Sequence, residues 1–292
     1  LGAIFFSRSG EVLSGSFLSE SLGISRQAVS KNIGVLRKTG FPIFPLERKG
    51  YIFKDSEESL HPLVLENEIQ RVVPSGQVWC FPSLSSTQKV MKELAGKGVP
   101  EGSLVLGETQ TAGKGRTARS WISPVGKGLY FSLLLRPSLP PGCVQLLNLL
   151  AGLAVCQSIG ECTSLSCDLK WPNDVLYENK KICGILSEAA TDSDSIRYAI
   201  VGIGINVNTA TIEFPEEIRT IATSLYSVLG KTFSRQRLLL KIYRNLMQKY
   251  FLMLSRGFDF FLPLYKERCA TLGKEISVSF HDTLLRGKAE GI

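Results

Sequence analysis

Apolar and polar residues near the beginning of the chain recur at helical spacing. Ser16–Leu22 carries an apolar stripe, and Gly23 then ends it, as a tight turn between two helices requires. Ser25 can cap a second helix because its hydroxyl can accept from free backbone N–H groups. The apolar residues of this second helix share one face: Ala28, Val29, Ile33 and Leu36. The pattern predicts two helices joined by a short turn.

The second helix keeps polar and basic residues away from its apolar face: Arg26, Gln27, Ser30 and Lys31. Two strand-like segments follow, Phe41–Leu46 and Tyr51–Phe53, and the turn between them carries Arg48 and Lys49. A helix-turn-helix followed by a hairpin with a basic tip is typical of a winged-helix DNA-binding domain. A small helical subdomain with a solvated charged face is the alternative interpretation.

The apolar period changes repeatedly beyond an acidic, polar linker at residues 55–62, so we expect a domain boundary near residue 60. The predicted helices are Pro62–Val73, Ser85–Lys97, Pro140–Gly160, Thr223–Leu229 and Ser234–Lys266. The predicted strands are Gln77–Pro82, Ser103–Glu108, Gly128–Arg136, Asp168–Tyr177, Lys181–Ala190, Ile196–Val207 and Glu275–Phe280. Parallel strands need long crossovers, so the three strands between residues 168 and 207 are predicted to form an antiparallel meander. The expected class is α+β, with a mixed or antiparallel sheet and helices, and not a doubly wound dinucleotide-binding fold.

Composition narrows the possible classes of protein. Hydrophobic residues make up 44% of the 292 residues and charged residues 21%, which argues against wholesale disorder. The longest apolar stretch, Val144–Ile159, is interrupted by glutamine and asparagine and is shorter than the about 20 residues that cross a bilayer. Leu1–Phe6 is too short for the apolar core of a signal peptide. We therefore expect a cytoplasmic protein with no membrane partner.

The cysteines and histidines support neither a disulfide framework nor a metal centre. The seven cysteines are an odd number, and no two of them form a C-x-x-C pair, so reduced thiols are expected. With only two histidines in the chain, no protein-held metal site is predicted.

The net charge of +8 points to a polyanionic partner, and its distribution is uneven. Residues 1–54 hold eight Lys or Arg and three Glu, which is more than half of the net charge in the first fifth of the chain. A basic N-terminal module on a nearly neutral remainder suggests that one part binds nucleic acid while the other does something else.

Candidate chemistry in the remainder begins with the segment Gly113-Lys114-Gly115-Arg116, which Arg119 extends. Two close glycines let the backbone approach a ligand, and the basic side chains suit phosphate or another anion. The spacing is not that of a Walker A loop. Taken alone, the segment could equally be a flexible basic surface loop.

A second group of candidates follows the long apolar helix. In Lys170-Trp171-Pro172-Asn173-Asp174 the proline interrupts or bulges the strand, which leaves a cation, an amide and a carboxylate at an irregular edge. A hairpin turn at Glu178-Asn179-Lys180 would bring Lys181 close to Asp174. Gly202 and Gly204 alternate along the next strand and remove side chains from one face, where a flat ligand or another backbone could lie. A polar turn and exposed hairpin lysines remain the alternatives.

Taken in order, these motifs resemble the biotin–protein ligases, and within them the bifunctional type that also represses the biotin operon. The resemblance rests on Ser86-Thr87 before a helix, Glu108–Arg116 with Trp121, Lys170–Asp174, Lys181, Gly184–Glu188, Gly202–Asn206 and the winged-helix N-terminus. It implies a biotin ligase fold related to the class II synthetases. It also implies that biotin and ATP form biotinyl-5′-adenylate, and that a lysine of a biotin carboxyl carrier protein then accepts the biotin. Operator DNA and a homodimer of the ligand-loaded protein are the further partners that it implies.

The resemblance also implies roles for individual residues. Lys181, Arg116 and Asp174 are the expected catalytic residues, with Lys181 at the α-phosphate and Asp174 and Asn173 supporting the nucleotide and its Mg²⁺. The residues expected to bind biotin or nucleotide are Ser86, Thr87, Gln88, Gln110, Lys114, Gly115, Arg116, Arg119, Trp121, Asn173, Lys181, Gly184, Gly202, Gly204 and Asn206. Those expected to bind DNA are Arg26, Gln27, Ser30, Lys31, Arg48 and Lys49.

Three features depart from the family pattern. Lys114 stands where arginine is usual and lacks the planar fork of a guanidinium, and Gln88 stands where asparagine is common. Residues 271–292 are too few for the C-terminal SH3-like barrel of the bifunctional enzymes, so we expect a partial, truncated segment after a ligase domain at 61–270. A lipoate–protein ligase and a DNA-binding regulator with an inactive ligase domain are the rival hypotheses.

Overall fold

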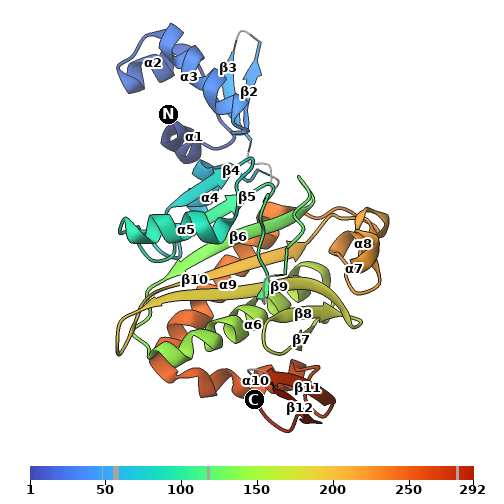
Figure 1. Ribbon diagram of the computed structural model, residues 1–292. Coiled ribbons are helices and arrows are strands. Elements are labelled where there is room, and N and C mark those ends of the chain that lie inside the picture. The colour runs from blue at the N-terminus through green and yellow to red at the C-terminus, as the bar shows by residue number, and fades with distance from the viewer. Residues whose placement is uncertain (48, 55–58, 117–118, 281–282) are drawn as a thin grey trace.

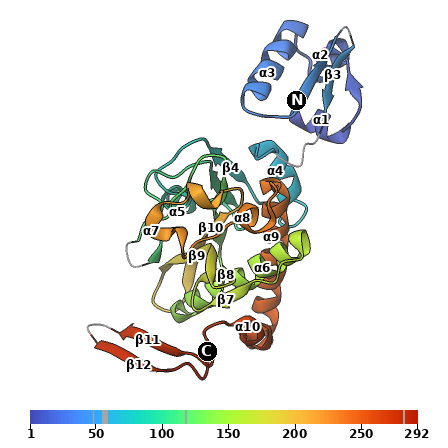
Figure 2. The same ribbon diagram turned by 90° about the vertical axis from the view of Figure 1, so that its right-hand side faces the viewer.

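The computed structural model describes residues 1–47, 49–54, 59–116, 119–280 and 283–292. A small N-terminal module lies at one end of the molecule, a sheet domain in the middle and a C-terminal hairpin at the other end (Figures 1 and 2).

The N-terminal module is a helix-turn-helix with a three-stranded sheet. Its elements are α1 (Gly2–Ser7), β1 (Val12–Leu13), α2 (Gly15–Leu22), α3 (Arg26–Lys38), β2 (Ile43–Leu46) and β3 (Gly50–Phe53). The Ser25 hydroxyl accepts from the Ala28 N–H at 3.2 Å, so the predicted N-cap of α3 is confirmed. Gly23 ends α2 in the left-handed conformation, as its place in the turn requires. The sequence did not reveal α1 and β1, although Phe5 of α1 is fully buried in the core of the module.

Helix α4 (Pro62–Ile69) belongs to the hydrophobic cores of both parts of the molecule. Val64 is buried in the N-terminal core, whereas Leu65 and Ile69 are buried in the core of the sheet domain. The His61 side chain caps the helix by accepting from the Leu63 N–H at 3.2 Å. One short helix therefore connects the two parts because different sides of it pack into the two cores.

The sheet domain is built on seven strands in the order β4-β5-β6-β10-β9-β8-β7. The strands are β4 (Val78–Phe81), β5 (Leu104–Gly107), β6 (Gly128–Leu135), β7 (Asp168–Lys170), β8 (Asp174–Tyr177), β9 (Lys180–Thr191) and β10 (Ile196–Asn206). Strands β4 and β5 are parallel and joined through α5 (Thr87–Gly96), and every other named pair is antiparallel. The predicted α+β class with a mixed sheet is confirmed.

Helices cover both faces of this sheet. Met91 of α5 packs on one face against Val105 and Leu134, while α6 (Val144–Thr163) and α9 (Arg235–Arg256) cover the other (Figure 1). The segment Pro141–Thr163 is long and apolar enough to cross a membrane by length and composition, but 67% of its apolar window is buried inside the protein. Helix α6 is apolar on all sides because it is buried between the sheet and α9.

Two predicted elements are divided in the structure. The predicted strand Asp168–Tyr177 is really the antiparallel pair β7 and β8, because the chain reverses at Trp171–Asn173, where the Trp171–Pro172 peptide is cis. The meander thus has four strands instead of three. The predicted helix Ser234–Lys266 ends at Gly257, whose φ of 79° suits glycine, and continues as η4 (Phe258–Phe261) and α10 (Leu262–Arg268).

Short elements complete the described chain. They are η2 (Pro141–Cys143), η3 (Thr211–Glu213), α7 (Glu216–Arg219), α8 (Leu225–Leu229), β11 (Glu275–Phe280) and β12 (Thr283–Lys288). Strands β11 and β12 form a separate two-stranded sheet within the described part of the chain. All seven cysteines lie in the described ranges, and none of them is bonded to another.

Candidate active site

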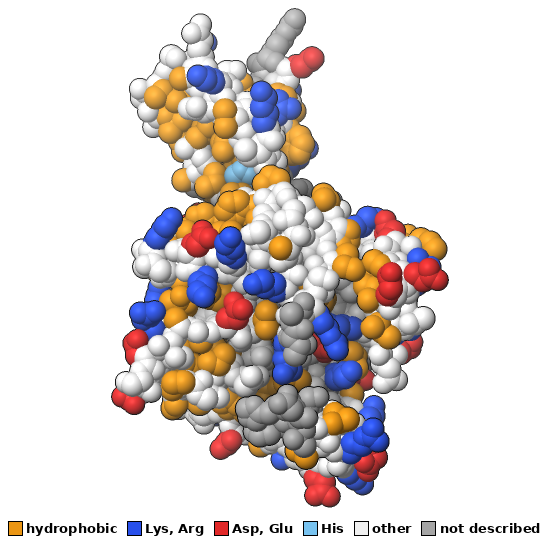
Figure 3. Space-filling model, viewed as in Figure 1, with side chains coloured by type: hydrophobic (Ala, Val, Ile, Leu, Met, Phe, Trp, Pro, Cys, Tyr) orange, Lys and Arg blue, Asp and Glu red, His pale blue; other side chains and the backbone are white. Residues whose placement is uncertain are grey.

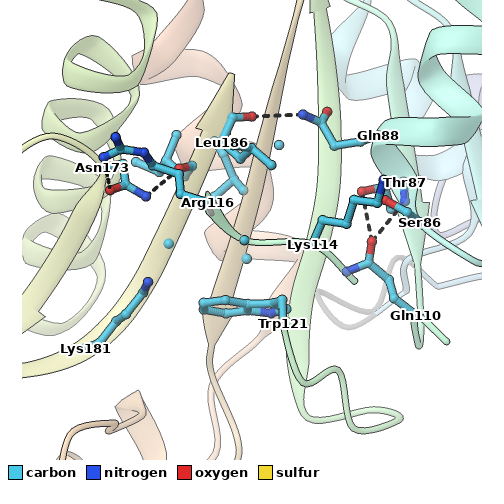
Figure 4. A pocket seen from close by; sticks show the side chains of 16 residues that line it. Ser86, Thr87, Gln88, Gln110, Lys114, Arg116, Trp121, Asn173, Lys181 and Leu186 are labelled. Carbon is cyan, nitrogen blue, oxygen red and sulfur yellow. Dashed lines mark hydrogen bonds between the residues drawn. The ribbon is translucent and has the colours of Figure 1, made fainter. Parts of the chain in front are cut away.

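A cleft lies where the N-terminus of α5, the loop between β5 and β6, and strands β9 and β10 meet (Figure 4). It gathers most of the residues that the sequence singled out. Those that line it are Ser86, Thr87, Gln88, Gln110, Lys114, Gly115, Arg116, Trp121, Asn173, Lys181, Gly184, Gly202 and Gly204. Ile185, Leu186 and Ile203 also line it, although none of the three was predicted as a site residue. Leu186 shares the cleft face of β9 with Gly184, whereas Ile185 and Ile203 are buried in the core of the sheet domain.

The first turn of α5 forms one polar end of the cleft. The backbone N–H of Thr87 donates to Gln110 Oε1 at 2.9 Å, and the Thr87 hydroxyl donates to the same oxygen at 3.2 Å. The Ser132 hydroxyl in turn donates to Thr87 Oγ1 at 2.9 Å. Ser86, Thr87 and Gln88 are buried, and Ser86 makes no side-chain cap to the helix. The start of α5 is therefore fixed in place with its first backbone groups facing the cleft.

Gln88 carries an unused hydrogen-bond acceptor. Its Nε2 donates to the Leu186 carbonyl at 2.9 Å, which ties α5 to β9. Its Oε1 is buried, and no donor among the described residues reaches it. A Cβ at Gly202 would lie 3.0 Å from the Gln88 amide carbon, so Gly202 leaves room for this side chain. A ligand with an N–H or O–H group could satisfy the oxygen.

The loop that carries Gly113–Arg116 folds back on itself and touches the opposite wall of the cleft. The Gly115 N–H donates to the Arg119 carbonyl at 2.7 Å, and the Trp121 N–H donates to the Gly113 carbonyl at 2.9 Å. Arg116 Nη1 donates to Asn173 Oδ1 at 3.4 Å, and Asn173 Nδ2 donates to the Ile185 carbonyl at 3.0 Å. The basic loop is therefore connected across the cleft to the turn between β7 and β8 (Figure 4).

The indole of Trp121 lies on the strands where the glycines remove side chains. A Cβ would lie 2.8 Å from the ring at Gly184 and 2.5 Å from it at Gly204. The Trp121 N–H is buried, and none of the described residues accepts from it. The free face that the glycines leave is therefore filled by a side chain of the protein itself, which still has a donor to offer.

Lys181 and Asp174 form an ion pair at the side of the cleft. Lys181 Nζ lies 2.7 Å from Asp174 Oδ1 and 5.4 Å from the centre of the Trp121 ring. The predicted proximity of Lys181 and Asp174 is therefore confirmed, as is the turn, because Glu178 and Asn179 both have positive φ. Both side chains are partly buried, so the carboxylate holds the ammonium at the side of the cleft.

The described residues favour neither a metal ion held by side chains alone nor a cysteine nucleophile. Among the described residues, no three His, Cys, Asp or Glu side chains are grouped to hold a metal ion, so a metal would need oxygens from a ligand in addition to Asp174. Cys183 lies next to this pair in β9, but it is fully buried, and burial raises the pKa of its thiol well above the usual value. The thiol therefore stays protonated and acts in packing.

Three of the predicted site residues do not line the cleft. Arg119 is exposed in the loop beyond Arg116. Asn206 is buried at the end of β10, where its Nδ2 donates to the Thr223 carbonyl at 3.0 Å. Asp174 is paired with Lys181, and of the two only Lys181 lines the cleft.

The N-terminal module presents the predicted DNA-binding residues to solvent. Arg26, Gln27, Ser30 and Lys31 are exposed on α3, and Lys49 is exposed on the wing. Arg48 lies outside the described residues. Arg26 donates to the Ser16 hydroxyl, which connects α3 to α2. In the space-filling view, Lys and Arg side chains lie on this module and again in the middle of the sheet domain (Figure 3).

Comparisons with known proteins agree with this division of the chain. Residues 80–206 match the biotin/lipoate A/B protein ligase family, and residues 3–52 match a helix-turn-helix domain. The chain is 38% identical over 288 residues to the bifunctional ligase/repressor BirA of Bacillus subtilis, covering 98% of this chain and 89% of that protein. It is 27% identical to the Escherichia coli protein of the same name, covering 97% and 86% of the two chains. The biotin protein ligase of Aquifex aeolicus, solved with biotin and ATP, has a similar structure with a TM-score of 0.64 and 34% identity, covering 74% of this chain and 87% of that one.

Proposed function

The chain belongs to the family of the bifunctional ligase/repressor BirA proteins, and from this we propose how its residues perform the two activities. The enzyme joins biotin to ATP to give biotinyl-5′-adenylate and pyrophosphate, and then transfers biotin to a lysine of a biotin carboxyl carrier protein. The helix-turn-helix module binds DNA and represses transcription in response to biotin.

The observation that carries the proposal is the set of unsatisfied polar groups in an otherwise well-bonded cleft. Gln88 Oε1 needs a donor and the Trp121 N–H needs an acceptor, and both are buried. A ureido ring offers both N–H donors and a carbonyl acceptor, so biotin can satisfy groups that cost free energy when left alone. The apolar side chain of Leu186, which shares the cleft face of β9 with Gly184, lines the same cleft and suits the hydrocarbon part of biotin.

Ser86, Thr87 and Gln110 are proposed to hold biotin beside these groups. The first backbone N–H groups of α5 carry a partial positive charge. Thr87 and Gln110 are held by each other and by Ser132, so the site needs little rearrangement to accept a ligand.

Lys181 is proposed to act where the biotin carboxylate oxygen attacks the α-phosphorus and pyrophosphate leaves. Negative charge crowds at this centre in the transition state, and a fixed ammonium stabilises that charge. Asp174, 2.7 Å from Lys181 Nζ, holds the lysine in position. No covalent enzyme intermediate is required, and catalysis rests on position and electrostatics.

Arg116 and Lys114 are proposed to close the basic loop over the adenylate. The contact from Arg116 to Asn173 supports this role, because it joins the loop to the opposite wall. Gly115 lets the backbone approach the ligand, and Arg119 is proposed to contact nucleotide phosphates from the exposed side. Water is then kept from the mixed anhydride until the acceptor lysine arrives.

Mg²⁺ is proposed to enter with ATP. The Asp174 carboxylate beside Lys181 offers oxygen that suits a hard cation, and the phosphates and water would complete its octahedral shell. The ion would neutralise phosphate charge during attack. Asn173 would support the nucleotide beside it.

The repressor activity is proposed to use residues 1–60, with the ligase domain at 61–270 and a separate C-terminal segment at 271–292. Arg26, Gln27, Ser30 and Lys31 would contact an operator, with Arg48 and Lys49 at the wing. A single winged helix offers few base contacts, so we propose that the ligand-loaded protein binds a palindromic site as a homodimer. The proposed location is the cytoplasm.

The decisive experiment is pyrophosphate release from ATP with biotin or with lipoate, followed by transfer of radiolabelled biotin to a carrier domain. Biotin-dependent release and labelling of the carrier lysine are expected. Release with lipoate alone would favour a lipoate ligase. Absence of release, together with biotin-dependent DNA binding, would favour a regulator with an inactive ligase domain.

A further inference from the structure

The basic loop has a neck, where its two ends leave adjacent strands. It starts after Gly107 of β5 and returns at Gly128 of β6, and these two strands are paired with each other. The side chain of Arg235, at the start of α9, lies at this neck. Its two terminal nitrogens donate to Glu108, with Nη1 at 2.7 Å from Oε2 and Nη2 at 3.2 Å from Oε1. Nη1 also donates to the Gly128 carbonyl at 3.3 Å. One guanidinium therefore bonds both ends of the loop.

Arg235 is itself held firmly. Asn208, just past β10, bonds both backbone groups of Phe233 at 2.9 Å, and its own N–H donates to the Lys127 carbonyl at 2.6 Å. Ser234 caps α9 by accepting from the Arg237 N–H at 3.0 Å. The Arg235 side chain is only 17% exposed. The returning end of the loop, the end of β10 and the start of α9 thus form one bonded unit.

This bonded unit lies outside the cleft, because Arg235 and Glu108 do not line it. The loop nevertheless carries Lys114, Arg116 and Trp121 into the cleft, and the direction in which it leaves the sheet decides where these side chains reach. A small shift at the neck becomes a larger displacement at Arg116, whose 3.4 Å contact with Asn173 has little tolerance. The fork geometry matters, since an ammonium cannot bond both Glu108 oxygens in one plane and the Gly128 carbonyl as well.

We propose that Arg235 is a positioning residue that closes the neck of the basic loop and thereby holds the loop over the adenylate. The proposal rests on the proposed ligase function and adds to it the element that aims the loop. It identifies α9, a helix on the opposite face of the sheet from α5, as part of the apparatus that retains the intermediate.

The test compares Arg235→Lys and Glu108→Gln with the parent and with the control Arg244→Ala, an exposed arginine further along the same helix. For both neck variants we expect the adenylate to dissociate about tenfold faster, because each loses hydrogen bonds to a charged group. We also expect a raised KM for ATP with a smaller change in kcat, since the lysine at the α-phosphate is untouched. The control should match the parent in both. Unchanged adenylate dissociation in both neck variants would overturn the proposal.

Limited trypsin digestion supplies a readout that does not depend on activity. The loop offers cleavage sites at Lys114, Arg116 and Arg119, and Arg235→Lys changes no cleavage specificity. If the neck positions the loop, both neck variants are cut there faster than the parent and the control, while thermal unfolding stays within a few degrees of the parent. Equal loop cleavage would overturn the proposal even with an inactive parent. An inactive parent with faster cleavage in the neck variants would reject the ligase function and keep the role of Arg235 in the loop.

Discussion

The N-terminal module and the cleft present their functional side chains in opposite ways. On α3 the four candidate DNA-binding residues come from six consecutive positions, and all are exposed. In the cleft the candidates come from segments more than a hundred residues apart, and many are buried and bonded to one another. The first arrangement can lose a side chain with little effect on its neighbours. The second cannot, because each group also positions another.

This difference predicts different behaviour of double mutants. Changes to exposed residues that share no partner add in free energy, whereas changes within one hydrogen-bonded network do not. The chain from Arg116 through Asn173 to the Ile185 carbonyl is such a network. Single substitutions in the cleft therefore report on several contacts, and matched pairs are needed to assign them.

The largest effect is expected for Lys181→Met, which removes the cation paired with Asp174. Adenylate formation should fall about 100- to 1,000-fold, as for the loss of a group that stabilises transition-state charge. Biotin affinity should change by less than about tenfold, because the charge is needed mainly where charge develops. Single-turnover pyrophosphate release and equilibrium biotin binding measure the two. A mutant that forms adenylate at the parental rate would make Lys181 only a hairpin charge.

Arg116→Ala should have the next largest effect. It should separate the rate at which the adenylate forms from the rate at which the adenylate dissociates. The loop loses its contact with Asn173, so the adenylate should escape roughly 10- to 100-fold faster, which corresponds to one charged hydrogen bond. Non-specific labelling of lysines on a bystander protein should rise. Asn173→Ala is the matched partner, and the double mutant should be no worse than the worse single mutant. Fully additive effects would show that the two residues act separately.

The two regions also differ in how much the sequence revealed. The Ser25 cap, the buried Ile33 and the basic face of α3 lie within one helix, so local periodicity was sufficient to predict them. The glycines of β9 and β10 predicted a bare face, but which side chain covers it depends on a loop far away in sequence, and it is Trp121. Pro172 predicted an interruption, whereas the chain actually reverses there. Arg235 lies 127 residues from Glu108, and nothing in its local pattern distinguishes it from the other basic residues of α9.

A smaller effect is expected on the other side of the comparison, for Lys31→Ala on α3. Removing one phosphate contact should lower DNA affinity about fivefold or more and reduce the slope of log affinity against log salt by about one. Lys31 is exposed on α3 and does not line the cleft, so the variant should form adenylate at the parental rate while its DNA affinity falls. Gel shifts at several salt concentrations measure the slope. A change in affinity with an unchanged slope would indicate that Lys31 does not contact phosphate.

The smallest effect is expected at His61, where the two regions meet. Its Nδ1 caps α4 by accepting from the Leu63 N–H, its Nε2 lies 3.0 Å from the Thr39 hydroxyl of the DNA-binding module, and its ring packs edge-on against Phe41. Burial lowers the pKa of His61 below its usual value of 6.5. Between the folded and unfolded pKa values the unfolded chain binds more protons, so stability rises with pH in that window. The contribution is fully present above the unfolded pKa and is lost as pH falls below it, because a protonated Nδ1 can no longer accept.

Acidification from about pH 7.5 to about pH 5.5 should therefore loosen the packing between α3 and α4. Amide hydrogen exchange in these helices measures the loosening. His61→Asn keeps a capping side chain that does not titrate, so its exchange should depend less on pH once the intrinsic rate is removed. Equal pH dependence in both proteins would rule out His61 as its source.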